Sequence, residues 1–300
     1  MRHRYDRLRQ IKALDPVADH LAIYRMTATL EFPWDMAQAL SLALFRTYAV
    51  PSIGGLLAAT GEFTERAQRR YDDTGLLLDA VLEHGPDGAD GRAAIRRINQ
   101  MHRRYDISDD DMRYVLSTFV VTPIRWLDAF GWRPMSVHER IADAEYHRVL
   151  GRHLGIPDLP RSWASFMRLH DEYERAHFGR DTGGRSVADS TLDLLATFPP
   201  FDLLPAAVVR QASVALMDTR LRDALGFPAP DRLVAAGTRA GLRARGLLLR
   251  LATPRREPVR VRDSATVRSR PPGYAIAALG TFPPGCPVPD GHGDGEPRPH

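Results

Sequence analysis

Apolar positions recur every three to four residues over most of the chain, and this spacing is typical of amphipathic α-helices. The segment RAAIRRINQMHRRY, residues 92–105, is one example, with apolar side chains at Ile95, Ile98 and Met101. No long stretch alternates strictly between apolar and polar residues, as a half-buried strand does. The hydrophobic pattern therefore predicts an all-α protein.

Helix-breaking residues and capping motifs divide the pattern into separate helices. Pro51, Gly61 and Gly85 end apolar segments, and Pro123 predicts a kink inside a longer helix. Ser136 and Glu139 have the spacing of a capping box at a helix start. The predicted helices cover residues 32–50, 52–60, 63–84, 92–105, 111–130, 137–155, 163–178, 187–198, 206–225 and 232–256.

The 300 residues contain no internal repeat and are enough to bury one large core. We expect a single helical domain over residues 25–252, preceded by a basic segment over residues 1–24. From residue 253 to residue 300 the periodicity is lost and Arg, Pro and Gly dominate, so we expect a flexible tail.

Charge and cysteine content indicate a soluble chain. The formal net charge is +4, and the single cysteine, Cys286, excludes an intramolecular disulfide and gives no sign of secretion. The basic N-terminus is not followed by the apolar region of a signal peptide. No apolar run approaches the ~20 residues that a membrane span needs. We therefore expect a cytoplasmic protein.

A basic amphipathic segment over residues 231–256 allows two interpretations. It could lie peripherally on an anionic membrane surface, or it could be a closing helix that packs its apolar side on the core and leaves its arginines solvated. Helical spacing places the arginines on one side and the apolar residues on the other: Arg239, Arg243 and Arg250 against Ala240, Ala244, Leu247, Leu248 and Leu251.

Three polar residues share a face of the helix predicted over residues 63–84. Arg70, Asp73 and Thr74 are spaced i, i+3 and i+4, and their face continues into Leu77 and Leu78. Burying charge is costly unless the charge is paired. The set is therefore either an ion pair at the edge of the core or a polar group that points inward for a function.

His102 lies on the apolar face of the next predicted helix, between Met101 and Tyr105. Such a histidine is either a hydrogen-bonded core residue or the ligand of a metal or a haem, which needs a neutral and desolvated imidazole. Asn99, one turn earlier, is a possible partner of the ring. The pattern alone leaves both alternatives open.

Other constellations carry less chemistry. Glu174 and His177 have the ExxH spacing of di-iron bundles, but no second ExxH pair follows. The chain has no P-loop, GxGxxG or GxSxG motif, so nucleotide-dependent and hydrolase functions lack support.

The combination of the polar helix and the histidine helix resembles a known family. The order FRTYAVPSI, LLAATGEF, RRYDDTGLLL, RRINQMHRRYDISDDDMRYVLSTFVVTPIRW and WRPMSVHE is similar to the MpaB-type oxygenases, which include the latex-clearing rubber oxygenases. The resemblance covers roughly residues 25–250. It implies a globin-like helical core around haem b, with His102 as the axial ligand of the haem iron.

The resemblance also implies roles for the polar helix. Arg70 and Thr74 match residues near the distal side of the haem in latex-clearing proteins, whereas Asp73 stands where those proteins have a lysine. We expect Arg70 to stabilise negative charge on dioxygen, the co-substrate, and Asp73 with Thr74 to deliver protons. Arg103 and Arg104 either pair with the haem propionates or form a solvated charged face.

The predicted activity is oxidative attack on a carbon–carbon double bond of a lipophilic, prenyl-like substrate. Two alternatives remain: a haem-binding sensor or carrier without turnover, and a basic helical protein that binds nucleic acid. No recognition-helix pattern occurs and the positive charge is concentrated near the C-terminus, so we expect no nucleic-acid partner.

Overall fold

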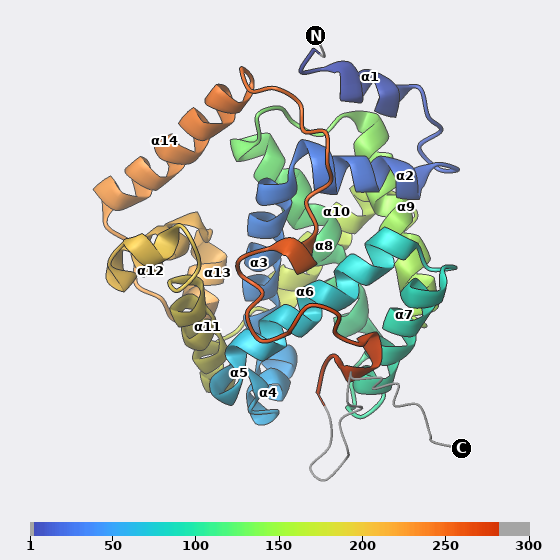
Figure 1. Ribbon diagram of the computed structural model, residues 1–300. Coiled ribbons are helices and arrows are strands. Elements are labelled where there is room, and N and C mark those ends of the chain that lie inside the picture. Colours follow the sequence, from blue (N-terminus) through green and yellow to red (C-terminus); the bar gives the residue numbers. More distant parts are fainter. Residues whose placement is uncertain (1–2, 282–300) are drawn as a thin grey trace, which may run out of the picture.

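The computed structural model describes residues 3–281, and these residues form helices and connecting loops without any strand (Figure 1). A π-helical segment spans Met26–Glu31, and short 3-10 turns span Phe201–Leu203, Val261–Asp263 and Ile276–Ala278. The α-helices are α1 (Asp6–Lys12), α2 (His20–Arg25), α3 (Pro33–Tyr48), α4 (Pro51–Ala59), α5 (Glu62–Glu65), α6 (Ala67–His84), α7 (Ala89–His102), α8 (Asp109–Phe130), α9 (Val137–His153), α10 (Trp163–His177), α11 (Thr182–Leu195), α12 (Ala206–Leu216), α13 (Thr219–Leu225) and α14 (Arg232–Leu249).

Helix α8 runs through the centre of the fold and packs against α3, α9 and α10. Ser108 caps its N-terminus by accepting a hydrogen bond from the backbone N–H of Asp111 at 3.0 Å. A kink was predicted at Pro123, and the structure shows that α8 continues as one helix through this residue to Phe130. Val120, Val121 and Ile124 are completely buried. The all-α, single-domain prediction is confirmed.

Helices α6 and α7 lie side by side and bring the two predicted polar sets together. Leu76 and Leu77 of α6 join Ile95 and Ile98 of α7 in the main hydrophobic core. This apolar contact fixes the helices that carry Arg70 and His102, respectively, and it positions the site described below. The globin-like arrangement of the core stays a prediction.

Two predicted helices are broken in the structure. Residues 63–84 divide into α5 and α6 at Arg66, whose φ of −136° is not helical. Residues 206–225 divide into α12 and α13, because the Asp218 side chain accepts a hydrogen bond from the backbone N–H of Leu221 at 3.0 Å and caps a new helix.

The N-terminal helices belong to the domain rather than preceding it. Ile11 of α1 and Ile23 of α2 are both completely buried and form a small cluster with Ala142 of α9. The basic segment expected over residues 1–24 is therefore anchored to the domain through Ile11 and Ile23.

Residues 253–281 are not a flexible tail, contrary to the prediction. We call residues 264–281 the C-terminal strap, because this segment crosses α6 and α7 (orange to red in Figure 1). The carboxylate of Asp72 accepts hydrogen bonds from the backbone N–H groups of Arg268 and Ser269 at 3.0 and 2.8 Å, and Leu279 is completely buried. Cys286 and the rest of residues 282–300 lie outside the described residues.

Helix α14 packs with the side opposite to the one expected. The buried carboxylate of Asp35 accepts a hydrogen bond from Arg245 at 3.0 Å, and Leu242 and Leu249 contact the main core. Leu247 and Leu251 instead face solvent. The interpretation in which the apolar side of this segment packs on the core is therefore wrong.

Candidate functional site

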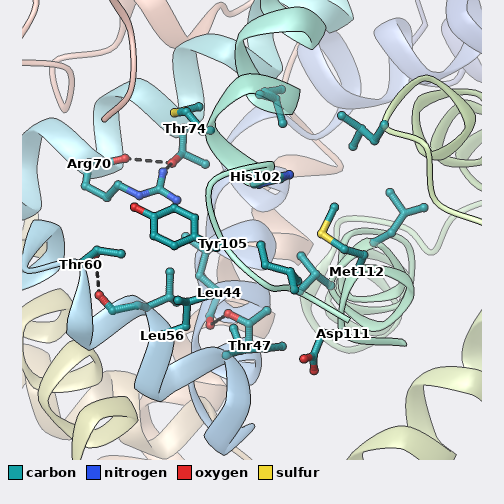
Figure 2. A pocket seen from close by; sticks show the side chains of 18 of the residues that line it. Leu44, Thr47, Leu56, Thr60, Arg70, Thr74, His102, Tyr105, Asp111 and Met112 are labelled. Carbon is teal, nitrogen blue, oxygen red and sulfur yellow. Dashed lines mark hydrogen bonds between the residues drawn. The ribbon is translucent and has the colours of Figure 1, made fainter. Parts of the chain in front are cut away.

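A cavity of about 400 Å³ lies where α3, α4, α6, α7 and α8 meet (Figure 2). Most of its wall is apolar, as the hydrophobic faces of these helices predict. Its apolar lining residues include Leu44, Ile53, Leu56, Leu57, Leu77, Leu78, Ile98, Met101, Met112, Val115, Leu116, Phe119, Leu150, Leu154 and Ile156. The cavity therefore suits a large hydrophobic ligand.

His102, the last residue of α7, lines this cavity. Its Nδ1 is buried without a hydrogen-bond partner, and neither ring nitrogen is hydrogen-bonded within residues 3–281. Asn99, the possible partner, instead donates to the carbonyl of His153 at 3.0 Å. Burial, with a smaller effect of the nearby Arg70 charge, lowers the pKa of His102 to about 4. The imidazole is therefore neutral at physiological pH and free to bind a ligand.

Arg70 and Thr74 point from α6 into the same cavity (Figure 2). The Arg70 guanidinium donates to the Thr74 hydroxyl, which itself donates to the Arg70 carbonyl at 2.9 Å. The guanidinium also lies over the Phe63 ring, 5.4 Å from its centroid. Burial lowers the pKa of Arg70, although an arginine stays charged. Of the described residues, Arg70 is the one lysine or arginine in the cavity wall.

Asp73 does not join Arg70 and Thr74, which corrects the prediction of a shared polar site. Its carboxylate accepts hydrogen bonds from Arg270 Nε and Nη2 at 2.6 and 2.7 Å and from the Gly280 backbone N–H at 2.9 Å. It is buried under the strap and does not line the cavity. The strap therefore engages the carboxylate outside the cavity wall.

Arg103 and Arg104 also lie outside the cavity. Both side chains are exposed; Arg103 Nε donates to the Asn99 carbonyl at 3.2 Å, and Arg104 Nη1 donates to the Thr281 carbonyl at 3.2 Å. Since α7 ends at His102, the next residues turn out toward solvent. Pairing of these arginines with haem propionates stays a prediction.

The ExxH pair on α10 serves a structural ion pair. Glu174 accepts a hydrogen bond from Arg46 Nε at 2.5 Å, and His177 stacks on Tyr173 with ring centroids 4.0 Å apart. No group of three or more potential metal ligands occurs within residues 3–281.

The donor set at the cavity fits a haem better than a metal held by protein ligands alone. A protein-only metal site uses at least three side chains, whereas a haem needs one axial imidazole from the protein. His102 offers a neutral, unpartnered imidazole on an apolar wall. The residues present therefore fit a haem b whose porphyrin supplies the remaining ligands.

Sequence patterns did not identify two further parts of the site. Tyr48, the last residue of α3, lines the cavity, and burial raises the pKa of its hydroxyl. Thr281 of the strap also lines the cavity. The sequence predicts that Tyr48 lies on the helix before Pro51. It does not show that this helix meets α6, α7 and α8 at the cavity, because these helices lie later in the chain.

Comparison with known proteins shows the family to which the chain belongs. The family model described as "ER-bound oxygenase mpaB/B'/Rubber oxygenase, catalytic domain" matches residues 28–250. The chain belongs to this family of oxygenases. The MpaB and rubber oxygenase domain thus includes α3 to α14, and with them every helix that lines the cavity.

Fungal members are similar over much of their length. The chain is 33% identical to the ER-bound oxygenase mpaB of Penicillium roqueforti (strain FM164), over 74% of this chain and 84% of that protein. It is 31% identical to the ER-bound oxygenase mpaB' of Penicillium brevicompactum, over 78% of this chain but 59% of that protein. In residues 3–281, no single helix is long and apolar enough to cross a membrane, whereas α3 and α4, bent by 97°, meet that criterion only as a pair.

Proposed function

We propose that this MpaB-family protein is a haem b-dependent oxygenase that uses dioxygen to oxidise or cleave a carbon–carbon double bond of a lipophilic, prenyl-like substrate. One observation carries the proposal: an unpartnered, neutral His102 faces the same apolar cavity as the Arg70 guanidinium. An imidazole without a hydrogen-bond partner in a buried site is costly unless a ligand engages it.

His102 would hold the iron through its ring, and the low pKa of this ring keeps its lone pair available. Haem b, when bound, supplies dioxygen binding and the oxidising chemistry. Arg70 contributes a fixed positive charge and N–H donors, which stabilise negative charge that develops on oxygen inside an apolar cavity.

Thr74 positions Arg70. Its hydroxyl accepts a hydrogen bond from the guanidinium and donates one to the Arg70 carbonyl. Both hydrogen bonds therefore hold the Arg70 side chain in position. Asp73, whose carboxylate is occupied by the strap, has no part in proton delivery.

The apolar lining supports a lipophilic substrate. Leucine, isoleucine, methionine and phenylalanine side chains form most of the wall and exclude water from the reacting groups. Such a wall recognises hydrocarbon by burial of its surface and offers few polar contacts.

The decisive experiment combines a spectrum with isotope labelling. We expect the purified protein, reduced and treated with carbon monoxide, to give a haem spectrum that is lost or strongly altered in the His102→Ala variant. An exposed histidine provides the matched control: His153→Ala should leave the spectrum unchanged. Oxygen from labelled dioxygen should appear in the products of prenylated test substrates.

Two outcomes would contradict the proposal. Identical haem spectra for the wild type and His102→Ala would show that His102 is not the ligand. Haem binding through His102 without any labelled product would instead favour the sensor or carrier alternative.

A further inference from the structure

Helix α14 presents an apolar stripe to solvent. Leu233, Leu247 and Leu251 are 83%, 56% and 86% exposed. The three alanines between them on the same face, Ala236, Ala240 and Ala244, are exposed as well. Spacings of three and four residues align the five positions from Leu233 to Leu247 along one side of the helix, and Leu251 follows two residues after its end. At 1.5 Å per residue, the five helical positions span about 21 Å.

The opposite side of α14 is fixed to the protein, so the stripe cannot turn inward. Arg245 bonds to the buried Asp35 and its guanidinium lies 3.8 Å from the centroid of the Trp34 ring. Gly246 is buried, and a Cβ there would come within 2.7 Å of the Phe130 carbonyl oxygen. In Figure 1 the helix runs along the outer edge of the molecule. The exposed leucines are thus a built feature of the folded chain.

Positive charge accompanies the stripe. The segment from Arg232 to Arg256 contains seven arginines and no acidic residue. Arg232, Arg239 and Arg243 are exposed and follow one edge of the stripe at helical spacing. An occupant of this face must therefore combine an apolar layer with negative charge.

We propose that α14 docks in the plane of an anionic membrane surface, with its leucines among the acyl chains and its arginines at the lipid headgroups. A nucleic-acid duplex fits less well, because the centre of the exposed face is apolar rather than basic. A second copy of the chain would bring the same positive charge to the contact. This proposal stands on the α14 surface and is independent of the haem site.

Vesicle co-sedimentation of the full chain tests the docking. We expect binding to vesicles of mixed phosphatidylcholine and phosphatidylglycerol and little binding to phosphatidylcholine alone. The double variant Leu247→Glu/Leu251→Glu should bind the anionic vesicles at least about tenfold more weakly, since it places charge where acyl chains would be.

A matched variant separates docking from a general effect of added charge. Val17→Glu/Val137→Glu also replaces two exposed apolar residues, 55% and 62% exposed, and neither lies on α14. This control should bind like the wild type. Equal melting temperatures would show that both double variants fold.

Three results would overturn the proposal. One is the absence of binding to anionic vesicles by the folded wild type; another is binding that Leu247→Glu/Leu251→Glu leaves unchanged. The third is self-association in sedimentation velocity, or binding to duplex DNA, that the wild type shows and this variant loses, because α14 would then have a protein or nucleic-acid partner instead.

Discussion

The polar residues on the two sides of helix α6 differ in their hydrogen-bond partners. On the strap side, Asp72 and Asp73 accept hydrogen bonds from several groups that lie about 200 positions later in the chain. On the cavity side, Arg70 forms hydrogen bonds only within its own helix and the ring of His102 forms none, both among the residues that the structure describes. Polar groups that are already paired hold the fold, whereas those left open are available to a ligand.

Asp73→Ala should have the largest effect on stability. Removing this carboxylate leaves the buried Arg270 guanidinium unpaired, and we expect the free energy of unfolding to fall by about 3–5 kcal/mol. Urea denaturation measures the change. The exposed carboxylate of Asp90 on α7 is the control, because Asp90→Ala should cost no more than about 0.5 kcal/mol. A loss below about 1 kcal/mol for Asp73→Ala would remove the distinction between the two sides of α6.

Arg70→Ala should leave the fold largely intact and reduce turnover. Loss of a preorganised charge at the reacting oxygen lowers kcat by about 10²- to 10³-fold in comparable sites. Product formation per bound haem gives the measurement. The neighbouring Arg69 does not line the cavity, so Arg69→Ala should keep near-normal turnover. Equal losses in both variants would place the effect in the helix and not in the cavity.

The titration of His102 provides an intermediate test. Its pKa is about 4 in the folded chain and near 6.5 when exposed, so the unfolded state binds the proton more tightly. The contribution of His102 to the free energy of unfolding should therefore decrease as the pH falls from about 6.5 to about 4. Denaturation of the haem-free protein at several pH values, beside His102→Leu, measures this. A wild type and variant with the same pH dependence would contradict a buried, neutral ring.

Thr74→Val should have the smallest effect. The substitution keeps the shape but removes the hydroxyl that orients the guanidinium, and we expect about a tenfold lower kcat. Thr74→Ser retains the hydroxyl and should restore most of the activity. If Thr74→Ser is as impaired as Thr74→Val, the methyl group and not the hydrogen bond is what matters.

Helical periodicity and one capping motif were sufficient to predict the all-α fold, the cap at Ser136, and the inward positions of Arg70 and His102. It placed Asp73 incorrectly, because residues one apart differ by about 100° around a helix. Asp73 and Thr74 can therefore face different neighbours although both share an i+3 or i+4 spacing with Arg70.

The strap could not be predicted because none of its contacts is local. Asp73 and Arg270 are 197 residues apart, and an irregular Arg- and Pro-rich segment shows no periodicity that would reveal a partner. For the same reason the orientation of α14 was missed: Arg245 turns inward to Asp35, which is distant in sequence.

Gly280 has a further consequence for the way the molecule is made. Its φ of +86° and its close approach to Met101, where a Cβ would lie 2.2 Å from the sulfur, bring Thr281 to the cavity wall. The Gly280 N–H donates a hydrogen bond to the carboxylate of Asp73, which is synthesised 207 residues earlier. Thr281 therefore joins the cavity wall only after residue 281 has been synthesised, so this part of the wall forms later than the helices that make up the rest of it.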